Sequence, residues 1–254
     1  MNSLEIACVK IRNGLNRVFP CSKKHLFSAG IITAAGSGTR MGNVSKQLLD
    51  LCGKPCIVYS LLAFQNCGDI DEIVLVAKKD EIERMRSLCR EYGITKLTSI
   101  VVGGDTRQAS VEAGFAAASS KCELIAIHDG ARPLIRSSDI SCLLKFARRY
   151  GAASAAMKMT DTVKRINDKG MIAETLERDS LYTVQTPQVF KADLYRISIA
   201  IAQKSGFQVT DDCSLAEHAG FQVYPVDLGH FNGKITHPQD LDLVCSALQE
   251  AQNA

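Results

Sequence analysis

Short apolar runs alternate along most of this chain with longer segments that are polar on one side. The runs are continuously apolar rather than alternating, which is typical of strands buried on both faces. They are residues 29–35, 72–77, 99–102, 124–127 and 152–157. The segments between them have helical length and periodicity. They are residues 55–66, 80–92, 106–118 and 138–150.

This alternation predicts an α/β protein with a Rossmann-like, doubly wound and mostly parallel sheet, covered by helices on both faces. Ligands of such sheets bind beyond the carboxyl ends of the strands. Three of the apolar runs lead directly into Gly36, into Gly103 with Asp105, and into Asp129. We therefore expect the functional residues to meet at one edge of the sheet.

Residues 160–190 interrupt the alternation. Residues 162–166 and 171–176 flank a glycine-containing turn at 167–170, a pattern that predicts a β-hairpin. A hairpin that projects from an α/β sheet leaves exposed edges, which a second subunit could cover. Beyond it the pattern predicts helices and one strand: helices at 191–205, 212–219 and 239–251, and a strand at 221–227.

Residues 1–28 form a basic N-terminal extension, and residues 29–254 form the main domain. The extension is expected to lie on the domain as a helix or to be a frayed tail. Contact with a membrane surface and an organellar transit peptide are the alternatives, the second of which would place the protein in an organelle stroma.

Composition narrows the function and the location. A net charge of +3 gives no reason to expect nucleic-acid binding. The ten cysteines are scattered without a Cys-x-x-Cys pair or zinc-finger spacing, so we expect free thiols in a reducing cytoplasm. The sequence contains no run of 18 apolar residues, and no membrane span is expected.

The string from Ala34 to Gly42, Ala-Ala-Gly-Ser-Gly-Thr-Arg-Met-Gly, follows a predicted buried strand and precedes Lys46. Its small residues allow backbone N–H groups to approach phosphates closely. It matches neither the P-loop nor the dinucleotide fingerprint. Arg40 and Lys46 beside such a loop suit transfer at an α-phosphate, where negative charge increases during the reaction.

Together with later strings, this loop resembles the cytidylyltransferases of the non-mevalonate isoprenoid pathway. The resemblance runs in order from about residue 28 to about residue 251. The strings that carry it are Gly53-Lys54-Pro55, Gly103-Gly104-Asp105-Thr106-Arg107, His128-Asp129-Gly130-Ala131-Arg132-Pro133, Asp161-Thr162-Val163, Thr175-Leu176-Glu177-Arg178, Gln185-Thr186-Pro187-Gln188, Thr210-Asp211-Asp212 and Lys234-Ile235-Thr236.

The resemblance implies a nucleotidyltransferase fold that transfers a cytidylyl group from CTP to 2-C-methyl-D-erythritol 4-phosphate, releasing pyrophosphate. It implies catalytic roles for Arg40, Lys46, Arg178 and Lys234. It implies nucleotide binding by Ala34, Ala35, Gly36, Gly104, Asp105, Arg107, Ser110, Asp129 and Arg132. It implies polyol phosphate binding by Thr162, Arg178, Thr186 and Lys234, and a place for Asp129 beside Mg²⁺.

In this family the arginine at the position of Arg178 reaches the active site of the other subunit, which implies a homodimer through residues 160–190. The nucleophile would be a phosphate oxygen that is already ionised, so no general base is required. Catalysis would then consist of alignment and charge neutralisation. His128 is expected to fix the loop by a hydrogen bond rather than to react.

Two residues depart from the family pattern. Ser45 precedes Lys46 where proline is common, and Gly233 precedes Lys234 where an aliphatic residue is frequent. Both changes are expected to give the neighbouring lysines more freedom.

Two other functions stay open. Ribitol 5-phosphate cytidylyltransferases share these motifs and would differ in the acceptor pocket. A non-catalytic nucleotide-binding regulator would be expected to lack Arg40, Lys46 or Asp129, and all three are present.

Overall fold

A computed structural model describes residue 9, residues 25–36 and residues 45–253 of this chain. Within them one large sheet has seven strands in the order β11-β7-β10-β6-β1-β4-β5. These strands are β1 (Ser28–Thr33), β4 (Glu72–Ala77), β5 (Leu97–Val102), β6 (Leu124–Asp129), β7 (Ala152–Lys158), β10 (Tyr182–Lys191) and β11 (Tyr224–Asp227). β10 pairs antiparallel with β6 and with β7, and the other neighbours are parallel.

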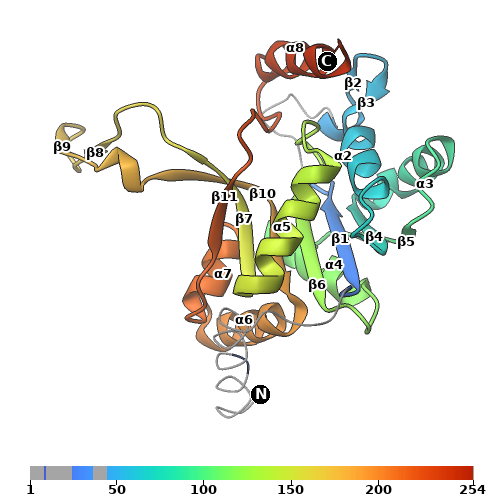
Figure 1. The fold of residues 1–254 in the computed structure, drawn as a ribbon, viewed down its shortest axis with the longest axis horizontal. Helices are drawn as coiled ribbons and strands as arrows, with labels where there is room; N and C mark the ends of the chain where they lie inside the picture. Colours follow the sequence, from blue (N-terminus) through green and yellow to red (C-terminus); the bar gives the residue numbers. More distant parts are fainter. Residues whose placement is uncertain (1–8, 10–24, 37–44, 254) are drawn as a thin grey trace.

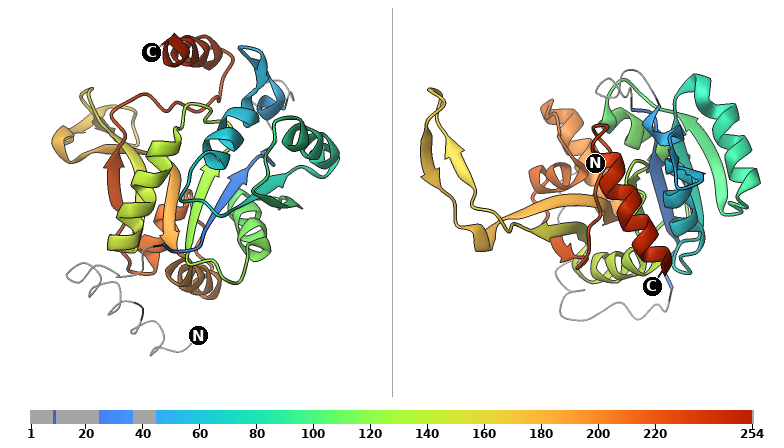
Figure 2. Two further views of the ribbon diagram at one scale, coloured as in Figure 1. Left: turned by 45° about the vertical axis from the view of Figure 1, so that its right-hand side comes forward. Right: turned by 90° about the horizontal axis from the view of Figure 1, so that it is seen from above.

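Helices cover both faces of this sheet (Figures 1 and 2). One apolar core lies between the sheet and α2 (Cys56–Gln65), α3 (Ile82–Glu91) and α5 (Ser137–Tyr150). The other lies between the sheet and α4 (Arg107–Ala117), α6 (Ala192–Ser205) and α7 (Asp212–His218). The predicted α/β class is confirmed.

Alternation along β1 shows why the strands had to be continuously apolar. Ile31 belongs to the core under α4, whereas its neighbour Ile32 belongs to the core under α2. Both side chains are fully buried. Successive side chains of a strand point to opposite faces, so a strand covered on both sides needs apolar residues at every position.

A third, smaller core lies beyond the carboxyl ends of the strands. It packs the last helix, α8 (Asp240–Asn253), on the small hairpin of β2 (Asp50–Leu51) and β3 (Lys54–Pro55), as Figure 1 shows at the top of the molecule. Its buried members are Leu51, Cys56, Leu134, Ile235, Val244 and Leu248. Short 3₁₀ turns precede α3 and the β2–β3 hairpin: η3 (Lys79–Glu81) and η2 (Lys46–Leu48).

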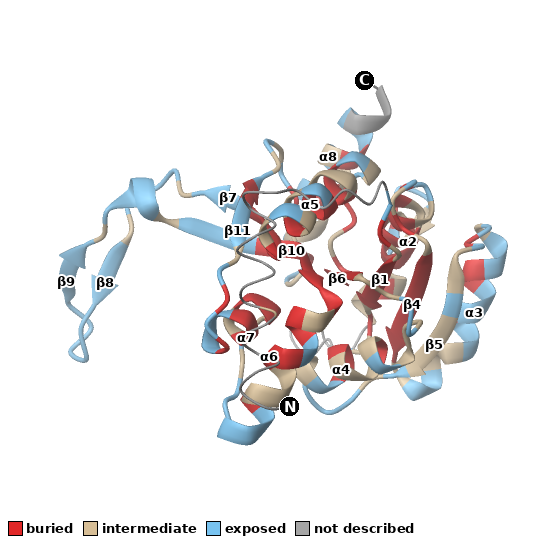
Figure 3. Ribbon diagram, turned by 60° about the horizontal axis from the view of Figure 1, so that its bottom comes forward, coloured by how far each residue is buried: buried red, intermediate tan, exposed pale blue. Residues whose placement is uncertain are grey.

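The predicted hairpin is present as β8 (Lys164–Ile166) and β9 (Ile172–Thr175), joined to the 3₁₀ turn η4 (Arg178–Ser180). It projects well away from the body of the molecule in Figures 1 and 3. All residues of both strands are exposed. Residues 160–181 are called the arm below.

Residues 182–191 differ from the sequence prediction, which included most of them in the projecting segment. They form β10, and their second half is buried between β6 and β7. The register shifts between Val184 and Gln188, around Pro187, which has no N–H for the ladder. The strand predicted at 221–227 is also shorter than expected: β11 begins only at Tyr224.

Most of the predicted extension, residues 1–28, lies outside the described residues. The structure therefore does not test the alternatives for this segment, a membrane-surface contact and a transit peptide. Val9 is helical and packs against the core under α4, α6 and α7. The described chain is anchored from His25 onward, because the Asp71 carboxylate accepts hydrogen bonds from the His25 ring and from the Ser28 amide.

The eight cysteines in the described part of the chain are free thiols, in agreement with the prediction. Four of them are buried, and burial raises the pKa of Cys56 to about 12. Among the described residues, the helices are all too short or too polar to cross a membrane.

Candidate active site

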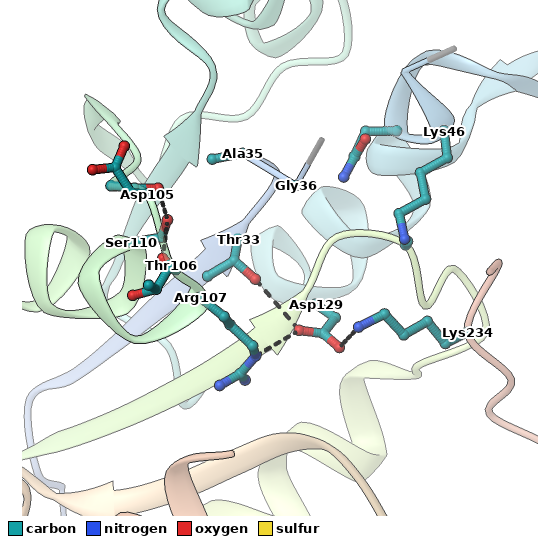
Figure 4. Close-up of a pocket in the computed structure, with 13 residues that line it drawn as sticks. Thr33, Ala35, Gly36, Lys46, Asp105, Thr106, Arg107, Ser110, Asp129 and Lys234 are labelled. Carbon is teal, nitrogen blue, oxygen red and sulfur yellow. Dashed lines mark hydrogen bonds and ion pairs between the residues drawn. The ribbon is translucent and has the colours of Figure 1, made fainter. Parts of the chain in front are cut away.

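A cavity of about 450 Å³ opens beyond the carboxyl ends of β1, β5 and β6, where the sequence placed the functional edge. Figure 4 shows the side chains that line it, which come from segments spread over the whole chain. They are Thr33, Ala35, Gly36, Lys46, Gln47, Gly104, Asp105, Thr106, Arg107, Ser110, Asp129, Ala131 and Lys234.

Close backbone approach shapes one wall of the cavity. A Cβ atom on Gly103 would lie 2.3 Å from the Cβ of Ala35 and 2.9 Å from the Oγ of Ser110. Such distances are well inside van der Waals contact, so only glycine lets the end of β5 pass between the β1 loop and α4. This close fit leaves Ala35, Gly36 and Gly104 on the cavity wall.

The start of α4 forms the next part of the wall. The Thr106 hydroxyl accepts a hydrogen bond from the amide of Ala109 at 3.0 Å and caps the helix. Ser110, one turn further, donates its hydroxyl hydrogen to the Thr106 carbonyl at 2.9 Å. The N-terminus of α4 therefore faces the cavity, and a helix N-terminus favours bound anions.

Asp129 lies at the centre of the charged groups. Its Oδ2 is 2.6 Å from the Lys234 ammonium and 3.8 Å from the Nε of Arg132. Its Oδ1 accepts from the Nε of Arg107 and from the Thr33 hydroxyl, both at 3.4 Å. Figure 4 shows the contacts of Asp129 with Thr33, Arg107 and Lys234, and the Lys46 side chain extends toward the same space from η2.

These cations keep Asp129 ionised. Burial by itself would raise the pKa of its carboxyl group, but the positive charges of Lys234 and Arg107 outweigh burial and hold that pKa well below its usual range. The cavity thus contains one carboxylate that is surrounded by basic groups. This arrangement suits an anionic ligand that can take over some of the basic partners.

Arg107 has a second and closer carboxylate partner. Its NH1 donates to the Oδ2 of Asp212, at the start of α7, over 2.7 Å. Although burial would lower the pKa of Arg107, Asp212 and Asp129 raise it above its ordinary value. Arg107 is therefore a fixed cation between two carboxylates.

Arg132 supports the site from beside the cavity. Its NH1 donates to the Asn232 carbonyl at 2.8 Å, which ties the loop after β6 to the segment that leads to Lys234. Its Nε has no hydrogen-bond acceptor among the described residues. Burial lowers its pKa, although Asp129 opposes this effect.

His128 holds the backbone of the site, as the sequence predicted. Its ring is fully buried and contacts the Thr186 hydroxyl through Nδ1 (3.1 Å) and the Arg132 carbonyl through Nε2 (3.2 Å). Since the Thr186 hydroxyl already accepts from the Asp129 amide at 3.0 Å, it donates to Nδ1. The neutral ring then donates from Nε2, and burial lowers its pKa to about 4.

The two departures from the family pattern are accommodated locally. The Ser45 carbonyl accepts from the Leu48 amide at 2.9 Å and so opens the turn that carries Lys46. A Cβ on Gly233 would lie 2.1 Å from the Phe231 ring. Glycine at this position allows that ring to fold over the backbone beside Lys234.

Those of the remaining predicted site residues that the structure describes do not line this cavity. Arg40 lies outside the described residues. Ala34 is buried just behind the cavity wall, and the Thr186 hydroxyl is engaged with His128 and Asp129. Thr162 and Arg178 are exposed on the arm, where the Arg178 guanidinium donates to the Thr160 carbonyl at 2.8 Å.

The sequence interpretation missed Thr33, Gln47 and Thr106 as cavity residues, and it assigned no role to Asp212 or Tyr195. Thr33 ends a buried apolar run with a hydroxyl, which is a usable signal. Asp212 gives no comparable signal, because an aspartate near a helix start is normally read as a cap.

A cage of protein ligands for a metal ion is not found in the described part of the chain, since no three His, Cys, Asp or Glu side chains gather there. A single carboxylate among basic groups that suit phosphates still fits Mg²⁺. This ion usually keeps several waters and binds through one or two carboxylates together with substrate phosphates.

Comparison with known proteins gives a consistent result. A family model described as 2-C-methyl-D-erythritol 4-phosphate cytidylyltransferase matches residues 29–250. The protein of that name from Clostridium novyi is 42% identical over 224 residues, which cover 87% of this chain and 96% of the relative. The one from Desulforamulus reducens is 42% identical over 217 residues, which cover 83% and 91%.

Solved structures agree with the sequence relatives. The 4-diphosphocytidyl-2C-methyl-D-erythritol synthase of Anaerococcus prevotii superposes with a TM-score of 0.79 at 32% identity, covering 88% of this chain and 96% of that one. The 2-C-methyl-D-erythritol 4-phosphate cytidylyltransferase of Thermus thermophilus gives a TM-score of 0.69 at 29% identity, covering 88% and 98%.

Proposed function

This chain belongs to the 2-C-methyl-D-erythritol 4-phosphate cytidylyltransferase family, and from that membership we propose that it transfers the cytidylyl group of CTP to 2-C-methyl-D-erythritol 4-phosphate. The products are 4-diphosphocytidyl-2-C-methyl-D-erythritol and pyrophosphate. The observation that carries the proposal is the convergence of Lys46, Arg107 and Lys234 on the Asp129 side of one cavity, next to the small-residue wall at Ala35, Gly36 and Gly104.

The chemistry requires charge control more than proton transfer. The second pKa of a phosphate monoester is about 6, so the attacking phosphate oxygen is ionised at neutral pH. It attacks the α-phosphorus of CTP in line with the departing pyrophosphate. Lys46 and Arg40 neutralise the charge that grows on the α-phosphate oxygens, and no residue has to remove a proton.

In this proposal the small-residue wall of the cavity binds the nucleotide. Ala35 and Gly36 lie along the phosphates with the buried Ala34 behind them, and Gly104, Asp105 and Ser110 hold the cytidine. Arg107 and Arg132 support the same region through Asp129. The N-terminus of α4 adds a favourable partial charge for the anion.

Mg²⁺ is part of the proposal, held by the CTP phosphates with Asp129 as its protein carboxylate. When bound, it neutralises phosphate charge and helps to orient the triphosphate. The lowered pKa of Asp129 keeps its carboxylate charged for this task at neutral pH.

The acceptor phosphate is assigned to Lys234, together with Thr162, Thr186 and Arg178. Lys234 lies at the cavity, and Thr186 acts by holding the Asp129 backbone. Thr162 and Arg178 are on the arm, so they serve this role in a homodimer in which the arm reaches the neighbouring subunit's cavity. The exposed apolar residues Ile166 (53%), Met171 (65%) and Ile172 (65%) support an arm that is covered by a partner.

Residues 1–28 are the N-terminal extension, and residues 29–254 are the cytidylyltransferase domain. The family match over residues 29–250 supports this division. The relatives compared are bacterial and give no support to a transit peptide in the extension. We place the enzyme in the cytoplasm, with CTP and the polyol phosphate as its partners rather than nucleic acid.

Pyrophosphate release by the purified protein tests the proposal directly. With Mg²⁺ and CTP, release should require 2-C-methyl-D-erythritol 4-phosphate and should not occur with ribitol 5-phosphate. Release with ribitol 5-phosphate alone would support the proposed CTP site and would make ribitol 5-phosphate the acceptor. No release with either polyol, in a protein that still binds CTP, would favour a non-catalytic nucleotide-binding protein.

A further inference from the structure

Asp212 is a buried carboxylate that lies outside the cavity and still reaches one of its cationic residues. It begins α7, and its side chain is 2% exposed. Its Oδ2 accepts from the NH1 of Arg107 at 2.7 Å, across 105 residues of sequence. The chemistry described above gives Asp212 no task, because the cavity is lined by Arg107 and not by Asp212.

The surroundings of Asp212 are built to hold its carboxylate in one place. The fully buried Tyr195 of α6 donates its hydroxyl hydrogen to the Oδ1 of Asp212 at 2.6 Å. The backbone amide of Asp212 donates to the Oε1 of Gln188 in β10 at 2.9 Å. The Asp212 side chain is thus fixed from α6, and its backbone is fixed from the sheet.

Arg107 is held more closely by Asp212 than by Asp129. The Arg107–Asp212 distance is 2.7 Å, whereas the Nε of Arg107 is 3.4 Å from the Oδ1 of Asp129. Without the charge on Asp212, Asp129 would be the only anionic partner of Arg107 among these contacts. We expect the guanidinium then to move onto the carboxylate that faces the ligand, because a partly buried cation is stabilised by its nearest anion.

We propose that Asp212 and Tyr195 are positioning residues that hold Arg107 ready for the nucleotide and keep it from closing over Asp129. The proposal rests on the proposed function, since it assumes that CTP occupies the cavity beside Arg107. It concerns binding of the nucleotide and leaves the acceptor side unaffected.

Calorimetric titration of CTP in the presence of Mg²⁺ tests the proposal with Asp212→Asn, Arg107→Ala and the double variant. Asp212→Asn should weaken CTP binding about tenfold, the size of one charge-assisted hydrogen bond. Added to Arg107→Ala, it should change binding by less than about twofold, because both changes act through the same guanidinium. The KM for CTP should rise while the KM for the polyol phosphate stays the same.

Two further variants separate positioning from folding. Tyr195→Phe removes one hydroxyl from an otherwise unchanged ring, and it should weaken CTP binding in the same direction by a smaller factor. Ser198→Ala removes a buried hydroxyl from the same helix, where it donates to the Leu194 carbonyl at 3.0 Å. This control should leave CTP affinity unchanged.

Equal CTP affinity in wild type, Asp212→Asn and Tyr195→Phe would overturn the inference while leaving the proposed function intact. An undiminished effect of Asp212→Asn in the Arg107→Ala background would also overturn it, because Asp212 would then act by another route. A wild-type protein that binds no CTP would instead overturn the proposed function, and this inference with it.

Discussion

At the scale of single residues, Lys46 is the cation whose contribution to the chemical step can be measured most directly. It begins the turn η2, and its side chain extends into the cavity beside Asp129 (Figure 4). A preorganised charge at the α-phosphate stabilises the transition state more than the ground state. Its removal should therefore affect turnover more than binding.

We predict that Lys46→Ala lowers kcat by about 100-fold or more, the usual cost of a lost contact to developing charge. The affinity for CTP should fall by a smaller factor. Steady-state kinetics together with CTP titration measure both effects. Lys54→Ala is a suitable control, because Lys54 lies in the nearby strand β3 and its ammonium sits over the Tyr59 ring. Wild-type turnover in Lys46→Ala would remove this residue from the catalytic set.

His128 links the site to the pH dependence of stability. Its pKa is lowered from 6.5 to about 4 by burial, so the folded protein holds the neutral ring while the unfolded chain becomes protonated below pH 6.5. Protons then favour the unfolded state. The stabilisation is complete above pH 6.5 and is lost as the pH falls toward 4.

We predict that the free energy of unfolding decreases by up to about 3 kcal/mol between pH 6.5 and 4 because of this group. Urea unfolding at several pH values in a metal-free buffer measures the change. His128→Asn should start from a lower stability and show a shallower slope in this window. An equal slope in wild type and variant would assign the pH dependence to other groups.

The sequence could predict those site residues that follow strand ends inside recognisable strings, such as Lys46, Asp105 and Asp129. Parallel strands bring their carboxyl ends to one edge, so local pattern and global position agree at these residues. Asp212 and Tyr195 could not be found in this way. Their contact with Arg107 depends on how α6 and α7 pack under the sheet, and no local pattern encodes that packing.

At the scale of elements, the continuously apolar runs and the glycine-closed helices made most of the fold predictable. β10 was missed for a physical reason. Its first three residues are exposed, and its buried remainder contains Pro187 and several polar residues, so neither a buried apolar run nor a regular strand is visible in the sequence. Its place is set by antiparallel pairing with β6 and β7, which are distant in sequence.

α8 provides a test of how an element outside the sheet supports the site. Leu248 packs in the small core with Ile235, which follows Lys234, and with Leu51, which follows the turn of Lys46. The Ile235 amide also donates to the Ala131 carbonyl at 2.9 Å. The small core therefore lies behind both lysines of the cavity.

We predict that Leu248→Ala lowers the free energy of unfolding by about 2–3 kcal/mol, as expected when a buried leucine leaves a cavity. It should also raise the KM for the polyol phosphate, because Lys234 loses its support. Leu243→Ala on the same helix is the matched control: Leu243 is 57% exposed and Leu248 is 6% exposed. Urea unfolding and steady-state kinetics of both variants measure the effects, and equal stability losses would contradict the burial argument.

At the scale of the whole molecule, the arm separates two of the assigned acceptor residues from the cavity. β8 and β9 are exposed over their whole length and make a two-stranded sheet of their own (Figure 3). An isolated two-stranded hairpin is marginal in water, so it gains stability from a partner surface. Arg178 at its base contacts only its own arm in the described hydrogen bonds.

If the arm completes the neighbouring subunit's cavity, two inactive variants should complement each other in a mixed dimer. The Arg178→Ala chain cannot supply the arginine to its partner's cavity, and the Lys46→Ala chain lacks the lysine of its own cavity. A mixed dimer has one cavity with intact Lys46 and an intact Arg178 from the other chain. Because half of the dimers are mixed and each contains one such cavity, equal mixing should restore about a quarter of wild-type turnover.

The measurement requires the two variants to be unfolded and refolded together, since a stable dimer exchanges subunits slowly. Each variant refolded alone is the control and should stay near its own low turnover. Light scattering on the same samples reports the dimer. Turnover of the mixture equal to the mean of the separate variants would place Arg178 in the cavity of its own subunit. A fully active monomer would rule out an active site shared between subunits.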